Sequence, residues 1–348
     1  MAVKHLLRAG ILSLVFLFLN ACSSVAISPT IPPTTLDPHG PAAARFAELW
    51  WVMFGLGTVV WVLVVVLMFA AVFRRRRARK SAAPDSFGGD TGRNWPILGG
   101  MVMPLVVIGI VFGYSIYTLA AVDNPTDKPA VRIQVTGRRW WWEVKYPDDK
   151  FTTANEIHIP VGVPVQIELE SADVIHSFWV PELHGKMDAI PTRINHITIQ
   201  ADKAGVYRGE CAEYCGLQHA HMGFMVVAES DADYKAWVSK QQQPAAAPAD
   251  ASAQQGQQVF LSAGCNFCHT VRGLDDKSID RSAIELGPDL THLSSRTTIA
   301  AASLTANRGN LAGWIVDSQH IKPGSLMPTI YINSQDLQNL LAYLETLR

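Results

Sequence analysis

Two long apolar stretches, separated by a short polar segment, dominate the first third of the chain. Residues 49–73 are almost uncharged, and residues 97–122 form the second stretch. A helix of the first length measures about 37 Å, which is enough to cross the hydrocarbon core of a bilayer. The basic run at residues 74–80 favours a cytoplasmic position for that end over nucleic-acid binding. The pattern predicts a transmembrane hairpin over residues 49–123, with everything after it on the outer face.

A shorter apolar stretch stands at the start of the chain. Residues 10–19 follow a basic start and are too few to span a bilayer, which is typical of a signal peptide. We therefore predict a signal peptide over residues 1–21. Its end resembles a bacterial lipoprotein signal, which implies lipid modification of Cys22. The alternative is simple cleavage near Ala21, which leaves Cys22 as a free thiol. Residues 22–48, rich in Ser, Thr, Pro and Ala, predict an external tether.

Apolar and polar residues alternate after the second predicted span. Residues 131–135 and 163–169 show the alternation, and residues 194–200 and 224–228 continue it. A period of two is typical of half-buried strands. Many short strands broken by Gly and Pro predict an antiparallel sandwich or Greek-key barrel over residues 130–240.

The regular pattern stops between this domain and the last one. Residues 241–253 are rich in Gln, Pro and Ala, have no clear period, and predict a linker. A flexible chain of this length reaches about 20 Å. The linker would therefore keep the final domain, residues 254–348, close to the barrel and make their encounter intramolecular.

Charge and cysteine content add little about partners but much about chemistry. The 348 residues carry a net charge of −1, which gives no global indication of nucleic-acid binding. The five cysteines are Cys22, Cys211, Cys215, Cys265 and Cys268. Each cysteine belongs to a motif with its own chemistry, and none is left for a structural disulfide.

A cluster of soft donors lies near the end of the predicted barrel. Cys211, Cys215, His219 and Met222 fall within twelve residues, and His176 lies 35 residues before the first of them. Thiolate, thioether and imidazole suit copper, whereas Met is not a usual zinc ligand. A single blue-copper centre needs one Cys, so the second thiolate allows a bridged copper pair. The alternative is a Cys211–Cys215 disulfide in an exported protein, which leaves the His and Met spacing unexplained.

The copper cluster and its surroundings resemble the binuclear CuA site of cytochrome c oxidase subunit 2. The resemblance is carried by residues 173–177, residues 188–191, Cys211, Glu213, Cys215, Gly216, His219 and Met222. It implies a cupredoxin-like barrel in which the two thiolates bridge both coppers. His176 and Met222 would complete one copper, and His219 and the Glu213 carbonyl would complete the other. The Glu213 side chain would reach a magnesium ion at the contact with subunit 1.

The last domain carries the attachment signature for c-type haem. Cys265 and Cys268 would form thioethers, and His269 would be the proximal iron ligand. A zinc site could use the same residues, but the sequence has no second Cys pair to close it. Two further motifs resemble class I cytochrome c, residues 287–290 and 322–328. This resemblance implies an all-α domain with Met327 as the distal ligand, which raises the haem potential; an ordinary packed methionine is the alternative.

Three consecutive tryptophans begin at Trp140. The resemblance implies that Trp140 is an electron-entry residue over the copper site. Barrel packing together with a membrane-interface belt is the alternative. Arg138 and Arg139 replace the His-Gln pair usual in the family, which suggests a changed docking surface for the electron donor.

The two resemblances together imply the electron-entry subunit of a proton-translocating bacterial haem–copper oxidase. Electrons would pass from cytochrome c or a quinol–cytochrome c reductase-type complex to haem c, then to CuA, and then to subunit 1, where oxygen is reduced to water. Further expected partners are subunit 3 and inner-membrane lipid, with no nucleic acid. One alternative is a CuA subunit of a nitric oxide reductase. Another is a membrane-anchored copper-binding or copper-delivery protein, against which the covalent haem argues.

Overall fold

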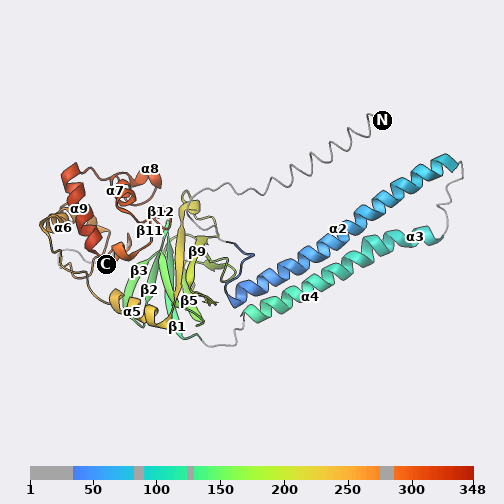
Figure 1. Cartoon of the computed structure of the whole chain (residues 1–348), viewed down its shortest axis with the longest axis horizontal. Coiled ribbons are helices and arrows are strands. Elements are labelled where there is room, and N and C mark those ends of the chain that lie inside the picture. Colours follow the sequence, from blue (N-terminus) through green and yellow to red (C-terminus); the bar gives the residue numbers. More distant parts are fainter. Residues whose placement is uncertain (1–33, 82–89, 124–128, 275–285) are drawn as a thin grey trace. The chain divides into compact units, whose positions relative to one another are not determined.

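The computed structural model describes residues 34–81, 90–123, 129–274 and 286–348. The predicted signal peptide, the first part of the tether and Cys22 lie outside the described residues. The described chain begins with helices, continues through strands, and ends in a helical domain (Figure 1). This order confirms the predicted fold class.

Two long helices contain the predicted spans. Helix α2 covers Pro41–Ser81, and α4 covers Met103–Asp123 after the short helix α3 (Asp90–Ile97) and the π-helical turn η1 (Leu98–Val102). Residues 41–77 and 94–122 are long and apolar enough to cross a membrane, and none of their most apolar window is buried. Side chains exposed in this way suit a lipid environment.

Helix α2 begins inside the segment predicted to be a tether. Pro41 occupies its first position, where proline is favoured, and three alanines with high helix propensity follow. Ala43 is buried, and its N–H donates to the carbonyl of Leu183. With this tertiary contact, the helix begins eight residues before the predicted span.

The strands after the hairpin form two five-stranded sheets. Their bounds are β1 (Val131–Arg138), β2 (Trp141–Tyr146), β3 (Phe151–Ala154), β4 (Glu156–Pro160), β5 (Val165–Ser171), β6 (His176–Trp179), β7 (Met187–Ala189), β8 (Asn195–Ile199), β9 (Gly205–Cys211) and β10 (Gly223–Glu229). The strand orders are β3-β2-β1-β5-β8 and β4-β10-β9-β6-β7. Pairs β1–β5 and β4–β10 are parallel, so the sheets are mixed rather than purely antiparallel as predicted.

Alternation along the strands places one set of side chains between the sheets. In β5, Val165, Ile167 and Leu169 are completely buried, as the period of two requires. At one end of the barrel, the rings of Trp142, Phe178 and Phe224 contact one another at centroid distances of 4.5–6.0 Å. This aromatic cluster forms a rigid base beneath the loops that follow β9.

The C-terminal domain packs helices around a second core. Helix α5 (Asp231–Gln241) follows the barrel, and the domain then contains α6 (Ala251–Ser262), α7 (Arg308–Val316), α8 (Ser318–Ile321) and α9 (Ser334–Thr346). Helix α6 begins at the end of the predicted linker, where the Asp250 carboxylate caps it by accepting from Ala253 N–H. A two-stranded ladder, β11 (Thr298–Ile299) with β12 (Leu304–Thr305), interrupts the predicted all-α pattern.

Helices α6 and α9 cross with almost no space between their backbones. A Cβ atom built on Gly256 would lie 1.9 Å from the carbonyl oxygen of Asn339. Only glycine permits this approach, which brings Phe260 and Tyr343 into edge-on contact at 5.7 Å. The crossing therefore fixes the core of the last domain.

Replacing Gly256 by Ala should destabilise this domain by about 1–3 kcal/mol, because the helices must separate to accept the methyl group. The measurement is hydrogen exchange of the α6 and α9 amides in the full-length protein. Gly313→Ala is the control, since Gly313 lies within α7 with nothing within 4 Å of its added Cβ. Exchange should accelerate in G256A and not in G313A; equal exchange in the two variants would contradict this account of the crossing.

Candidate metal centres

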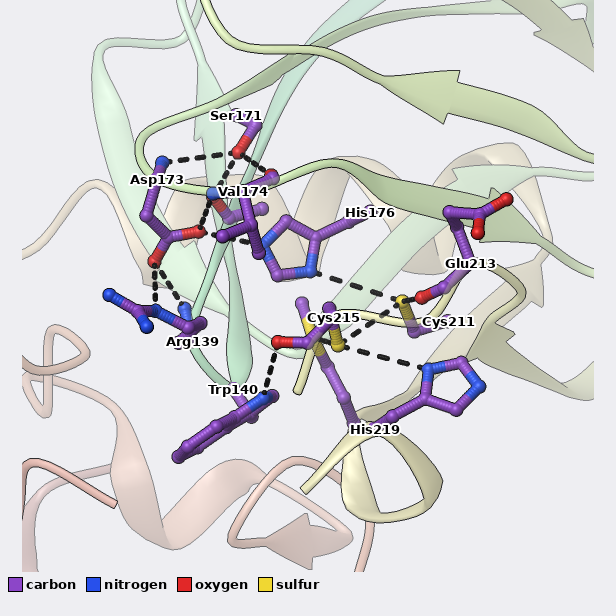
Figure 2. Close-up of polar contacts among 12 residues, drawn as sticks. Arg139, Trp140, Ser171, Asp173, Val174, His176, Cys211, Glu213, Cys215 and His219 are labelled. Carbon is purple, nitrogen blue, oxygen red and sulfur yellow. Dashed lines mark hydrogen bonds and ion pairs between the residues drawn. The ribbon is translucent and has the colours of Figure 1, made fainter. Parts of the chain in front are cut away.

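Two separate segments bring the predicted copper ligands to one end of the barrel, β6 and the stretch from the end of β9 to the start of β10. His176 is the first residue of β6, and Cys211 is the last residue of β9. Cys215, His219 and Met222 lie in the loop that connects β9 to β10. Figure 2 shows the two thiols side by side with the imidazoles on opposite sides of them.

The donor atoms converge on the two sulfurs. The Sγ atoms of Cys211 and Cys215 are 3.8 Å apart, and both thiols are free. Nδ1 of His176 lies 3.9 Å from Cys211 Sγ. Nδ1 of His219 and Sδ of Met222 each lie 3.8 Å from Cys215 Sγ. The disulfide alternative is therefore wrong for this structure, and the donor set, buried except for the half-buried His219, has the chemistry of a copper-binding site.

The two thiols influence each other's ionisation. The contact with Cys215 lowers the pKa of the Cys211 thiol. The same contact and burial raise the pKa of Cys215. Loss of one proton therefore disfavours loss of the other, and a cation bound between the sulfurs would favour loss of both.

Asp173 orients the His176 ring. Oδ1 of Asp173 lies 2.8 Å from His176 Nε2 and accepts from the Val174 N–H at 2.7 Å. Oδ2 accepts from the Arg139 N–H, also at 2.7 Å. Burial lowers the pKa of His176, but the hydrogen bonds with Asp173 and Cys211 outweigh it and raise the pKa overall. A carboxylate on one ring nitrogen leaves the other nitrogen directed at the metal position. Sequence reasoning missed this role, although the Asp-x-x-His spacing was its signal.

Close packing also limits where the His176 ring can lie. A Cβ on Gly137 would lie 2.6 Å from its Cδ2, so only glycine fits at this position in β1. On another side, the ring of Trp142 meets it edge-on at 5.8 Å. The imidazole is thus held by a hydrogen bond and by contact on two sides.

The backbone carbonyl and the side-chain carboxylate of Glu213 point to different places. Its carbonyl oxygen lies 3.2 Å from Cys211 Sγ, whereas its carboxylate faces away, 3.7 Å from Lys186 Nζ. His221, between two predicted ligands, is exposed and contacts Gln218 instead of a sulfur. The backbone of Glu213 is therefore available to the copper site, and its side chain is available to a different group.

Trp140 packs directly against the copper-ligand loop, which is residues 212–222 between β9 and β10. Its indole N–H donates to the carbonyl oxygen of Cys215 at 3.0 Å. The ring packs over Gly216, whose φ of +114° suits glycine and whose added Cβ would lie 3.2 Å from the indole. The side chain is buried, so both the packing role and the electron-entry role remain compatible with its position.

The last domain contains a cavity of about 320 Å³ that is lined by the predicted haem-binding residues. These are Cys265, Cys268, His269 and Met327. Nδ1 of His269 donates to the carbonyl of Pro288 at 2.9 Å, and burial lowers the pKa of this imidazole. The neutral ring then offers Nε2 as a metal ligand. A Cβ on Gly287 would lie 2.7 Å from the ring, so glycine is required here.

The segment that carries Met327 is tied down by backbone contacts. The Met327 carbonyl accepts from Ser318 Oγ at 2.6 Å and from Gln319 Nε2 at 2.7 Å. Many of the other residues that line the cavity are apolar, including Phe260 and Trp314. The residues present fit a haem group, with an imidazole and a thioether available as axial ligands.

Residues of the barrel close one wall of the same cavity. Arg139, Trp140 and Trp141 line it together with the residues of the last domain. Lys322, also buried, donates from Nζ to the carbonyl oxygen of Trp140 at 2.8 Å. Trp140 therefore contacts the copper-ligand loop and also lines the haem cavity. The role of Lys322 was not predicted from the sequence, because 182 residues separate the two partners.

Comparisons with known proteins agree with both halves of this description. Residues 149–229 match the family model for the cytochrome c oxidase subunit II periplasmic domain. Residues 253–348 match the model for cytochrome c.

Relatives that match over most of their length give the same result. Cytochrome c oxidase subunit 2 of Alkalihalophilus pseudofirmus is 34% identical over 325 residues, which cover 90% of this chain and 91% of the relative. The same subunit of Bacillus subtilis is 30% identical over 99% of both chains. Quinol oxidase subunit 2 of Bacillus subtilis is 29% identical and covers 70% of this chain and 74% of its own length. The chain belongs to the cytochrome c oxidase subunit 2 family and carries a cytochrome c domain at its C-terminus.

Proposed function

We propose that this chain is the electron-entry subunit of a bacterial haem–copper oxidase with a covalent haem c and a binuclear CuA centre. Electrons arrive from an external donor and leave towards subunit 1, where oxygen is reduced to water. The observation that carries the proposal is the convergence of donors from two distant chain segments, His176 and residues 211–222, on two buried thiols 3.8 Å apart. The cofactors supply the redox chemistry when bound, and the chain sets their ligation, spacing and burial.

The division of the copper ligands follows the family resemblance, and the distances are consistent with it. Cys211 and Cys215 would be shared by both coppers. His176, which lies beside Cys211, and Met222, which lies beside Cys215, would complete one copper. His219, beside Cys215, and the Glu213 carbonyl, beside Cys211, would complete the other.

The haem assignment rests on the cavity and its donors. Cys265 and Cys268 would form the thioethers, and His269 would be the proximal ligand, with its tautomer set by the Pro288 carbonyl. Met327 would supply the thioether as the distal ligand. Trp140 lines this cavity and donates a hydrogen bond to the Cys215 backbone. Its position supports a role as the electron-transfer residue between the two centres.

The partners follow from the family and from the C-terminal domain. The two apolar helices anchor the chain in the bacterial inner membrane, with both cofactor domains on the outer face and subunits 1 and 3 alongside. The Glu213 carboxylate, which faces away from the sulfurs, is the proposed magnesium ligand at the subunit 1 contact. A cytochrome c domain in the same chain favours electron entry from cytochrome c or a quinol–cytochrome c reductase-type complex over direct oxidation of a quinol.

Cys215→Ser tests the copper assignment and the function together. The variant complex should lose the visible absorption of the mixed-valence copper pair and most of its donor-driven oxygen consumption, because serine removes one bridging thiolate. The haem c spectrum should persist. His221→Ala is the control, since this neighbouring side chain faces Gln218 and not the sulfurs.

An unchanged copper spectrum in C215S would reject the ligand assignment. Gas consumption by the purified wild-type complex, supplied with oxygen or with nitric oxide, distinguishes an oxidase from a nitric oxide reductase. The proposal predicts that oxygen is the gas consumed, and faster consumption of nitric oxide would contradict it.

Met327→Ala tests the distal ligand of the haem. The long-wavelength band of His/Met-ligated haem should disappear and the reduction potential should fall, because thioether ligation raises the potential. The neighbouring variant Leu326→Ala keeps the thioether and should retain the band. Survival of the band in M327A would mean that another residue is the distal ligand.

A further inference from the structure

A turn of the cytochrome c domain contacts the copper-ligand loop on both sides of Met222. Residues 300–303 form this turn, between β11 and β12. Ser303 Oγ donates to the carbonyl oxygen of His221 at 3.2 Å. The N–H of Gly223 donates to the carbonyl oxygen of Ala301 at 3.1 Å. The peptide groups that flank Met222 are therefore both hydrogen-bonded to the turn.

The residue before Ser303 is also attached to the barrel. Arg208 donates from Nη1 to the carbonyl oxygen of Ala302 at 3.2 Å. A Cβ on Gly223 would lie 3.2 Å from the Cβ of Ala302, so the two backbones are in close contact. Ala301 and Ala302 are buried. A larger side chain at Ala302 would push the turn off the copper-ligand loop.

The turn has an unusual backbone conformation that suits this contact. Ala300, Ala301 and Ala302 have φ values of +53°, +57° and +56°. Three successive residues with side chains in the left-handed region are disfavoured by contact between Cβ and the carbonyl oxygen. Such a conformation persists where surrounding contacts fix it. Here the three carbonyls are taken by Lys322 Nζ, Gly223 N–H and Arg208 respectively.

A buried carboxylate holds the chain that leads into the turn. Glu156 of the barrel, 4% exposed, accepts through Oε1 from Thr297 N–H, Thr297 Oγ1 and Thr298 N–H at 2.7, 2.6 and 3.1 Å. A buried charge needs such compensation. Lys322 donates to the carbonyl oxygens of Ala300 and Trp140. The chain is thus anchored to the barrel at residues 297, 298 and 300, directly before its contacts with the copper-ligand loop.

From these contacts we propose that residues 300–303 are a positioning element for the copper centre. The turn holds the backbone of the loop that presents Met222 and His219, so that retention of copper depends on the docked cytochrome c domain. The inference rests on the proposed copper function and extends it. Without the turn, the His221 carbonyl and the Gly223 N–H lose these two hydrogen bonds, and the Met222 segment is held less tightly, with the bond from the Cys211 N–H to the Met222 carbonyl remaining.

Two variants and a matched control test the inference in the full-length protein. Ser303→Ala removes the hydroxyl that donates to His221, and Ala302→Leu forces the turn away from Gly223. Ser295→Ala is the control, because Ser295 Oγ also donates to a histidine carbonyl, that of His292 within the same domain, at 2.8 Å. Copper is extracted with bathocuproine disulfonate under ascorbate, and the released cuprous complex is followed by absorbance. The haem c spectrum reports that the cytochrome c domain is folded and loaded.

S303A should release copper about two- to tenfold faster than the wild type, as expected for loss of one hydrogen bond. A302L should release it faster still, and S295A should match the wild type. Wild-type rates in both S303A and A302L would overturn the inference, as would equal acceleration in S295A. If A302L loses its haem, S303A alone decides. A wild-type protein that binds no copper would instead overturn the proposed function, so the two failures are distinguishable.

Discussion

The contact between two buried thiols, Cys211 and Cys215, is the constraint on which the rest of this structure depends. Sulfurs 3.8 Å apart cannot both ionise easily without a cation, as the opposite shifts of their pKa values indicate. The barrel provides the rigid end on which they meet, since Cys211 closes β9 and the aromatic cluster around Trp142 lies beneath. The loop to β10 then needs only eleven residues to bring the remaining thiol, an imidazole and a thioether to the same place. Electron transfer benefits from such rigidity, because little has to move when the charge changes.

The cytochrome c domain is joined to this centre by more than its linker. Trp140 is shared by the copper-ligand loop and the haem cavity, and Lys322 fixes its backbone from the haem side. Glu156 and the turn at residues 300–303 add contacts that bury polar groups of both domains. Buried polar groups demand well-matched partners, so these contacts favour one docked arrangement. The short linker then has the simple role of keeping the domains together.

Much of the fold and of the candidate metal sites could be predicted from local sequence. The candidate copper ligands could be proposed because closely spaced thiol, imidazole and thioether side chains are typical of copper sites, and the candidate haem ligands because the haem motif is contiguous. The strands were found through their period of two, and the fold class was correct. The parallel pairs β1–β5 and β4–β10 were not found, because strand order depends on the whole chain and not on any one segment.

The residues whose positioning roles were not predicted from the sequence were missed for a shared physical reason, which is that their roles depend on tertiary contacts. Glu156 and Thr297 are 141 residues apart, and Lys322 is 182 residues from Trp140; no local pattern marks either pair. Asp173 was visible only as part of a family motif, and its effect on His176 needed the ring orientation. Helix α2 begins at Pro41 because of a tertiary contact of Ala43, which overrides the polar composition before it. Composition and spacing therefore identified the chemistry, and the structure was needed to show what positions it.

The central claim is that one chain holds a copper pair and one haem. Metal analysis of the fully loaded, purified complex, combined with electron paramagnetic resonance of the copper centre, tests it most directly. After the copper of subunit 1 is subtracted, the account predicts two copper ions for each haem c and a spectrum with one unpaired electron shared by both coppers. A single copper ion per chain, or none, would contradict it.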